Sequence, residues 1–278
     1  MTVYIPTMSR YDNLMKIVPR WLDQGIPVRL MVTQGEFQEH VIFGREAGWH
    51  LKDVKVIMQK GIGIGAARRS CVIHARRYGL ESIIMTDDDM KPVSDVRPLL
   101  TEAARPGVLG VGAVRPIHDH FTHGAISRNK GVILCPGGWG FQLFGLNVRT
   151  ASQIGNFDAL LHSYGEDAEL CRLGISKGIP WRAHCDVRCD SIGARYAPGG
   201  INARFRTPEL RTEAEYACLF RIHQRWPRYT NPPNRPLRVA WQRMLNDFIP
   251  DWRERSALHG GSLWPGAAQS QPESASRA

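Results

Sequence analysis

Short strand signals alternate with amphipathic helix signals through the first 86 residues, and this alternation constrains the fold more than any other feature of the chain. Each predicted strand is a short apolar run, and each predicted helix carries apolar residues at helical spacing. Because strands joined by helices pair in parallel, the pattern predicts an α/β fold with helices on both faces of a sheet. The predicted strands are residues 2–7, 28–33, 53–58 and 81–86, and the predicted helices are 11–22, 36–47 and 66–78.

After residue 98 the pattern becomes mixed, so we expect a mostly parallel sheet with some strands of other direction. The longest uncharged run, residues 131–148, holds five glycines and a proline, and we interpret it as two strands joined by a loop. We therefore predict no membrane span. The other elements predicted here are strands at 108–114 and 179–190 and helices at 149–154 and 167–177.

Basic charge is concentrated towards the C-terminus. Residues 204–243 carry nine arginines against three glutamates and supply +6 of the formal net charge of +10. Aromatic residues interleave with these arginines, a mixture that suits phosphate neutralisation with base stacking. A helix over residues 209–225 packed on the sheet explains the aromatics equally well. The net charge itself suggests a nucleic acid, a nucleotide or an anionic membrane face as partner, or a basic surface with no partner.

Composition also indicates the domain organisation and the compartment. We expect one domain over residues 1–201, a basic helical extension over 202–258, and a disordered tail rich in Gly, Ser, Pro and Ala over 259–278. The six cysteines are scattered and form no C-x-x-C pair, and the start of the chain carries no secretory signal. We therefore expect reduced thiols and a cytoplasmic protein, in the host cytoplasm if a phage encodes it.

Three consecutive acids, Asp87, Asp88 and Asp89, follow the last strand of the predicted parallel series. Carboxylates crowded at a strand end repel one another unless a cation or strong donors compensate them. In a D-x-D arrangement the outer residues can face the same side, so we predict that Asp87 and Asp89 hold Mn²⁺ or Mg²⁺ together with substrate phosphates. A solvated acidic turn is the alternative reading.

Glycines at 61, 63 and 65 precede a predicted helix that carries Arg68 and Arg69 in its first turns. Free amides at a helix start, with two guanidinium groups, predict an anion site. The same residues fit the G-x-G-x-x-A dinucleotide fingerprint, with acids about 20 residues further on, so NAD binding is an alternative. A purely structural glycine turn is another.

A second acidic motif, Gly165-Glu166-Asp167, precedes a predicted helix. The alternative is that these acids are simply stabilised by the dipole at the N-terminus of the helix.

A histidine motif lies between the two acidic motifs in the sequence. His118, His120 and His123 have the spacing H-x-H-x-x-H, which indicates either a zinc site or, in our preferred interpretation, a polar loop.

Taken in order, five motifs resemble those of family 2-like GT-A glycosyltransferases. They are VYIPTMSR (3–10), AARR (66–69), TDDDMKP (86–92), IGNFD (154–158) and GEDAEL (165–170). The resemblance covers roughly residues 1–192 and implies a Rossmann-like GT-A domain that binds a nucleotide-sugar. It also implies an inverting, metal-dependent transfer in which Asp167 is the general base and Glu166 orients the acceptor.

The same resemblance assigns residues to the UDP-sugar donor and to the metal. The donor residues are Pro6, Thr7, Ser9, Glu36, Gly65, Arg68, Asp87 and Asp88. The metal ligands are Asp87, Asp89 and Asp190. Two departures stand out. Glu36 alone replaces the usual acidic pair near the nucleoside, and Asp190 or His184 would have to replace a histidine metal ligand; a core or surface role for either is the alternative.

The chain is also similar to the phage TET-associated glycosyltransferases, which add sugars to hydroxymethylated pyrimidines in DNA. That similarity implies double-stranded DNA as the acceptor. A polysaccharide or lipid glycoconjugate acceptor, an NAD-binding enzyme and a non-catalytic nucleic-acid-binding domain remain open alternatives.

Overall fold

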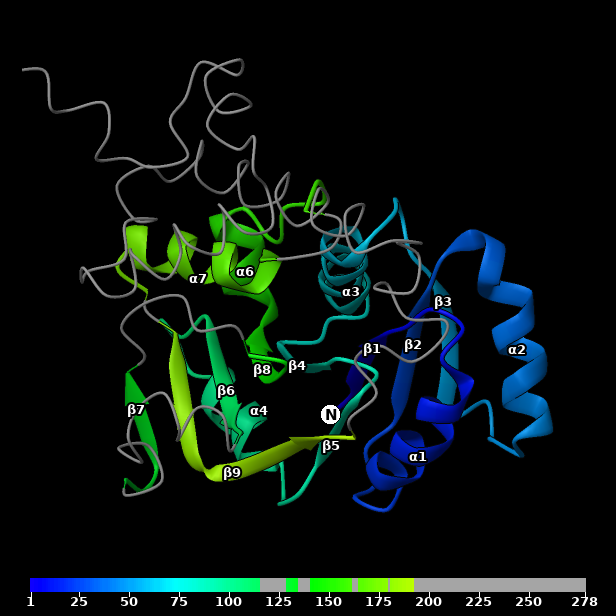
Figure 1. Ribbon diagram of the computed structural model, residues 1–278. Coiled ribbons are helices and arrows are strands. Elements are labelled where there is room, and N and C mark those ends of the chain that lie inside the picture. Colours follow the sequence, from blue (N-terminus) through cyan, green and yellow to red (C-terminus); the bar gives the residue numbers. More distant parts are fainter. Residues whose placement is uncertain (116–128, 135–140, 162–164, 180, 193–278) are drawn as a thin grey trace, which may run out of the picture. The chain divides into compact units, whose positions relative to one another are not determined.

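The computed structural model describes residues 1–115, 129–134, 141–161, 165–179 and 181–192 (Figure 1). All of them belong to the first of the two units into which the chain divides, residues 1–204. The predicted histidine loop, the basic extension and the C-terminal tail therefore lie outside the described residues.

Strands and helices alternate in the described part of the chain (Figure 1). The strands are β1 (Val3–Pro6), β2 (Val28–Val32), β3 (Val54–Met58), β4 (Ser82–Thr86), β5 (Met90–Pro92), β6 (Gly110–Val114), β7 (Val132–Leu134), β8 (Leu143–Asn147) and β9 (Arg182–Ser191). The helices are α1 (Tyr11–Leu22), the short 3₁₀ helix η1 (Gln34–Glu36), α2 (Phe37–Glu46), α3 (Ile64–Arg77), α4 (Arg97–Ala103), α6 (Val148–Ile154) and α7 (Glu166–Ser176).

These strands form a nine-stranded sheet, counted over the described residues, in the order β3-β2-β1-β4-β8-β6-β9-β5, with β7 also paired to β9. The β1–β2, β1–β4 and β2–β3 pairs are parallel, because helices α1, α2 and α3 carry the chain back between successive strands. Strand β8 runs antiparallel to β4 and β6. The predicted α/β fold with a mixed sheet is confirmed.

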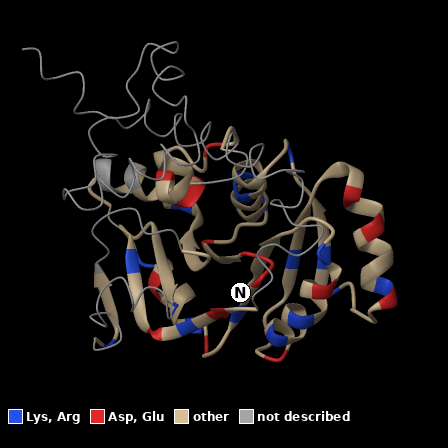
Figure 2. Cartoon of the chain, viewed as in Figure 1, with Lys and Arg blue, Asp and Glu red and all other residues tan. Residues whose placement is uncertain are grey.

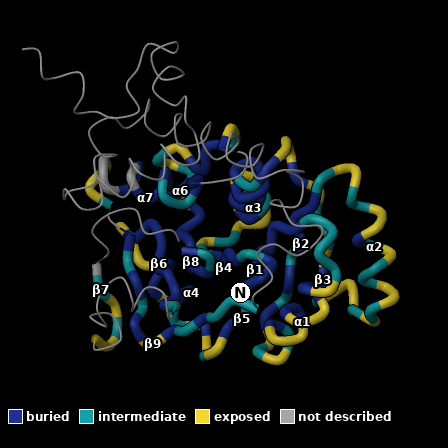
Figure 3. Tube along the Cα trace, in the orientation of Figure 1, coloured by how far each residue is buried: buried dark blue, intermediate teal, exposed yellow. Residues whose placement is uncertain are grey.

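Alternate residues of the parallel strands face opposite layers of helices. Val3 and Ile5 of β1 belong to a buried apolar cluster that includes Trp21 of α1 and also takes in residues of α2 and α4 (Figure 3). Tyr4, between them, is hydrogen-bonded through its hydroxyl to Nδ1 of His74 in α3, at 2.8 Å. Since neighbouring strand residues point to opposite faces, α1 and α3 cover opposite sides of the sheet.

The boundaries predicted for the parallel half agree with the structure to within two residues at each end, and α1 has the predicted bounds. The sequence reading missed β5 and α4. Strand β5 is three residues long and exists through its antiparallel pairing with β9, which is distant in sequence. Helix α4 has Pro98 in its first turn, where proline is tolerated, and it lies where the sequence pattern becomes mixed.

This topology gathers the loops that follow β1, β2 and β4 at one edge of the sheet, since parallel strands end on the same side. The acidic motif after β4 therefore lies beside the loop after β1. None of the described helices is long and apolar enough to cross a membrane.

Candidate functional site

Asp88, the middle acid of the cluster, is anchored by the loop after β1. Its Oδ2 accepts a hydrogen bond from the Thr7 hydroxyl at 2.8 Å, and its Oδ1 pairs with Nη1 of Arg10 at 2.5 Å. Burial raises the pKa of Asp88 to about 7, while Arg10 and Thr7 act to lower it. Both carboxylate oxygens are thus held by protein groups, and the contact of Asp88 with the donor stays a prediction. Arg10 was not predicted as a site residue.

Asp87 and Asp89 flank this anchor and are held by hydrogen bonds of their backbones. The Asp87 amide donates to the Gln142 carbonyl at 2.9 Å, and the Asp89 carbonyl accepts from the Ile192 amide at 2.8 Å. The side chain of Asp87 is about a quarter exposed, at 24%, and that of Asp89 is 10% exposed. These bonds fix the turn between β8 and the end of β9.

The electrostatics of this outer pair suit a cation. Burial raises the pKa of Asp89, and the negative charge of Asp87 raises it further, against the effect of Arg10. Nη2 of Arg10 lies 3.8 Å from Asp89 Oδ2, whereas the buried Oδ1 has no hydrogen-bond partner among the described residues. A hard divalent cation would satisfy this oxygen and relieve the repulsion between the two carboxylates.

A third protein ligand for such a cation is not evident in the described part of the chain, which contains no cluster of three or more His, Cys, Asp or Glu side chains fit to hold a metal. Asp190 lies on β9 opposite Lys91 of β5, and its Oδ1 accepts a hydrogen bond from the Ser191 amide at 2.9 Å. His184 lies further back on β9, with Nδ1 3.9 Å from the Asp186 carboxylate. Asp190 as a ligand therefore stays a prediction.

Arg68 of α3 joins the acidic turn to the second acidic motif. Figure 2 shows basic residues in blue on α3. Its Nη2 lies 2.7 Å from Asp87 Oδ1, and its Nη1 lies 3.0 Å from Glu166 Oε1 and 4.0 Å from Asp167 Oδ2. Burial acts to lower the pKa of Arg68, but Glu166, Asp87 and Asp167 outweigh it and leave this pKa raised. The guanidinium therefore faces three carboxylates, and its contact with the donor diphosphate stays a prediction.

Glu166 and Asp167 open helix α7, where the helix dipole favours acids. Burial raises the pKa of Glu166 to about 7, and it also raises the pKa of Asp167, with Arg68 opposing both shifts. The side chain of Glu166 is 6% exposed and that of Asp167 is 15% exposed. Asp167 is thus the more accessible acid, whereas Glu166 faces Arg68.

Hydroxyl groups from two loops converge on Glu36 at the nucleoside end predicted for the site. The Ser9 hydroxyl donates to Glu36 Oε1 at 3.0 Å, and the Thr33 hydroxyl donates to Oε2 at 2.6 Å. Ser9 has a φ of 48°, a left-handed conformation uncommon for a residue with a side chain. Pro6 ends β1 beside Met31 of β2, and among the predicted donor residues of the first loop it is Ser9 that contacts Glu36.

The glycine loop before α3 is used for close packing. The Gly65 amide donates to the Leu161 carbonyl at 3.0 Å, and a Cβ on Gly65 would lie 2.2 Å from the Asp158 carbonyl oxygen. Gly61 and Gly63 have φ values of 91° and 89°, which favour glycine. The amide of Gly65 is thus bonded within the protein, and the donor contact of this residue stays a prediction, as does the dinucleotide alternative.

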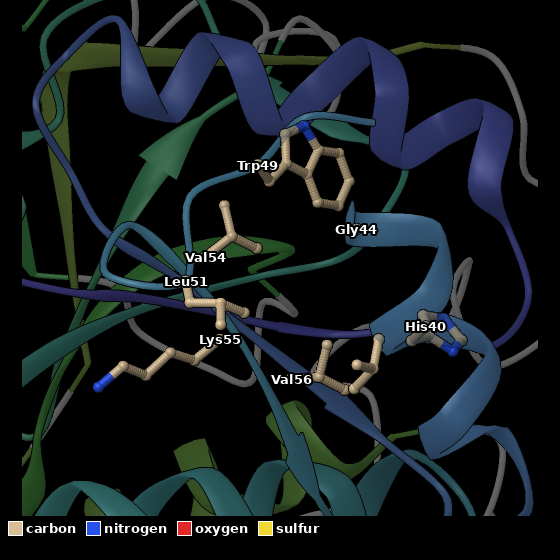
Figure 4. A pocket seen from close by; sticks show the side chains of 8 residues that line it. His40, Gly44, Trp49, Leu51, Val54, Lys55 and Val56 are labelled. Atoms are coloured by element: carbon tan, nitrogen blue, oxygen red, sulfur yellow. The ribbon is translucent and has the colours of Figure 1, made fainter. Parts of the chain in front are cut away.

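An apolar cavity of about 290 Å³ lies elsewhere, between α2 and the edge strand β3 (Figure 4). It is lined by His40, Val41, Gly44, Trp49, Leu51, Val54, Lys55 and Val56. None of the predicted site residues lines it. The described cysteines, Cys71, Cys171, Cys185 and Cys189, are buried, and their reduced state stays a prediction.

No protein-family model and no curated protein matches the chain. Among solved structures, it is similar to the mannosyltransferase PcManGT from Pyrobaculum calidifontis in complex with GDP-Man and Mn²⁺, with a TM-score of 0.53 and 18% identity over 79% of this chain and 64% of that one. It is also similar to GalNAc-T7 with UDP, GalNAc and Mn²⁺, with a TM-score of 0.53 and 13% identity over 92% of this chain and 56% of that one. The chain thus spans less than two thirds of either protein's length. At this level of identity the likeness shows the fold alone, which is the GT-A-like, Rossmann-type fold.

Proposed function

We propose that this protein is a metal-dependent inverting glycosyltransferase that moves a sugar from a UDP-sugar to an acceptor hydroxyl. The observation that carries the proposal is the position of Arg68, 2.7 Å from Asp87 and 3.0 Å from Glu166, which brings the two acidic motifs together. The GT-A-like fold supports it, as do two structural neighbours solved with a sugar nucleotide or with UDP and a sugar, each with Mn²⁺.

Asp87 and Asp89 would hold the Mn²⁺ or Mg²⁺ ion. The buried Oδ1 of Asp89, which has no hydrogen-bond partner within the described part of the chain, fits this role. Such ions commonly use one or two carboxylates and complete their shell with substrate phosphates. When bound, the ion would stabilise negative charge on the departing diphosphate.

Asp167 would act as the general base. It would take the proton of the acceptor hydroxyl while that oxygen bonds to the anomeric carbon and the bond from this carbon to the diphosphate oxygen breaks. Burial raises the pKa of Asp167, which makes its carboxylate a stronger base. Attack from the side opposite the leaving group inverts the anomeric centre. Glu166 would support this arrangement through Arg68.

Double-stranded DNA bearing 5-hydroxymethylpyrimidines is the acceptor that we favour. The net charge of +10 supports a polyanionic partner. Within the described residues, helix α3 contains no acid and exposes Arg69, Arg76 and Arg77. Residues 204–243 add further arginines.

The test is sugar transfer from UDP- and GDP-sugars with Mn²⁺ to hydroxymethylated DNA, to polysaccharide and to lipid acceptors. We expect transfer from a UDP-sugar to DNA, with binding that weakens steeply as salt rises. Transfer only to polysaccharide or lipid would overturn the DNA acceptor, and no turnover of any nucleotide-sugar would overturn the activity.

Asp167→Asn tests the role of the base in the same assay. We expect turnover to fall about 10²–10⁴-fold, because a general base contributes this much, while donor binding changes little. Asp95→Asn, an exposed acid paired with Arg97, is the control and should keep full activity. Near-normal turnover of Asp167→Asn would assign the base to another residue.

A further inference from the structure

The side chain of Arg68 is 3% exposed and lies between two acidic motifs about 80 residues apart in sequence. We propose that Arg68 is a positioning residue for cation binding: its forked guanidinium fixes Asp87 relative to Glu166 and Asp167, so that the acidic turn is ordered before the cation arrives. This inference rests on the proposed function and assigns Arg68 a role other than direct contact with the donor.

The geometry of the fork carries the inference. Nη2 donates a hydrogen bond to Asp87 Oδ1 at 2.7 Å. Nη1 forms an ion pair with Glu166 Oε1 at 3.0 Å, although it has no hydrogen-bond partner among the described residues. Different nitrogens of one planar group thus contact different motifs. A guanidinium keeps these two directions fixed, whereas a lysine ammonium is a point charge on a flexible stem. The Phe144 ring lies 5.3 Å from the Arg68 Cζ and supports the face of the guanidinium.

The backbone hydrogen bond of Asp87 does not orient its side chain, so a second contact is needed to orient the carboxylate. The hydrogen bond from the Asp87 amide to Gln142 fixes the main chain of the turn. The side chain is 24% exposed, and the Arg68 contact fixes its direction. Cation sites depend strongly on partners that orient their ligands, so loss of this contact should weaken cation binding.

A simple counter-ion would behave in the opposite way. A buried positive charge that only neutralised Asp87 would compete with the cation for the same oxygen, and its removal would tighten cation binding. A positioning residue predicts weaker binding even when the charge is kept as lysine. The sign of the change therefore separates the two roles.

The experiment measures Mn²⁺ affinity of the full chain by electron paramagnetic resonance of free Mn²⁺, with and without UDP, and requires no turnover. In Arg68→Lys and Arg68→Met we expect affinity in the presence of UDP to fall about 10–100-fold, the range found when groups that orient metal ligands are lost. The controls are Arg182→Lys and Arg182→Met, which break a pair with the buried Glu102 away from the acidic turn and should keep wild-type affinity.

Glu166→Gln provides a milder variant if Arg68→Met fails to fold. It removes one arm of the bridge without touching a cation ligand, and we expect it too to weaken Mn²⁺ binding. Wild-type or tighter binding by Arg68→Lys, judged on folded protein by circular dichroism, would overturn the positioning role and leave the proposed function standing. Absence of Mn²⁺ binding by wild-type protein with UDP would overturn both.

Discussion

At the scale of single residues, the three consecutive acids have three different surroundings. Asp88 is enclosed by Thr7 and Arg10, Asp87 faces Arg68, and Asp89 keeps a buried oxygen without a partner among the described residues. The sequence predicted that the outer two share a side as metal ligands, and this stays a prediction, since Asp87 contacts Arg68 and Asp89 lies 3.8 Å from Arg10. The anchoring of the middle acid depends on Thr7, 81 positions away, which no local pattern reveals.

Asp88→Ala should lower the free energy of unfolding by about 3–5 kcal/mol, because it leaves the guanidinium of Arg10 buried without its closest carboxylate. The matched control is Asp95→Ala, whose partner Arg97 is exposed and which should cost less than about 1 kcal/mol. Urea unfolding of the metal-free proteins provides the measurement. Equal, small effects of the two substitutions would show that Asp88 is not an anchor.

At the scale of elements, helix α3 organises the site from its first turn. Gly65 lets the backbone of residues 158–161 lie against the helix, and Arg68, one turn later, reaches both acidic motifs. The sequence correctly located the glycine loop before a helix. It could not show that the glycine is needed for contact with another part of the chain, because that contact joins segments nearly a hundred residues apart.

Gly65→Ala should destabilise the protein by about 1–3 kcal/mol, the usual cost of overpacking, because the new Cβ would lie 2.2 Å from the Asp158 carbonyl oxygen. Gly44→Ala is the control within α2, where the nearest atom to the new Cβ is on Trp49 at 3.5 Å. Alanine there should stabilise by about 0.5–1 kcal/mol, through its better helix propensity. Thermal unfolding compares the two, and a stabilising Gly65→Ala would contradict the packing role.

At the scale of the whole molecule, the sequence predicted the fold better than the site. Strand–helix alternation is a local signal, and it located the parallel half of the sheet. Arg10 escaped notice because an arginine at the start of a helix has no distinctive pattern, and its role depends on burial beside Asp88. The resemblance assigned Asp87 to the donor and the metal, Glu166 to the acceptor and Arg68 to the donor, but it did not show that Arg68 contacts both acids.

Buried acids should make the stability of the metal-free protein depend on pH. Burial raises the pKa of Glu166 from 4.5 to about 7, so the folded state holds its proton more tightly than the unfolded chain does. The stability that this group contributes is fully present below pH 4.5 and is lost as the pH rises to about 7.

The unfolding free energy of the wild-type protein should therefore fall as the pH rises through this range. In Glu166→Gln this fall should be smaller by on the order of 1–3 kcal/mol. Urea unfolding at pH 5 and pH 8 measures it in wild type and variant. The raised pKa of Glu166 would be contradicted if the wild-type protein became more stable as the pH rises and Glu166→Gln showed the same pH dependence.

Metal-dependent nucleotide binding by Asp89 tests the central claim most directly. The measurement is the thermal stability of wild-type protein and Asp89→Ala with UDP, GDP, NAD or DNA, each with Mn²⁺ or with EDTA. We predict that UDP stabilises the wild-type protein in Mn²⁺, by about 2.7 kcal/mol at a hundred times its Kd, and that Asp89→Ala abolishes the Mn²⁺-dependent part. Stabilisation by NAD in EDTA, or by UDP equally with and without Mn²⁺, would contradict the account.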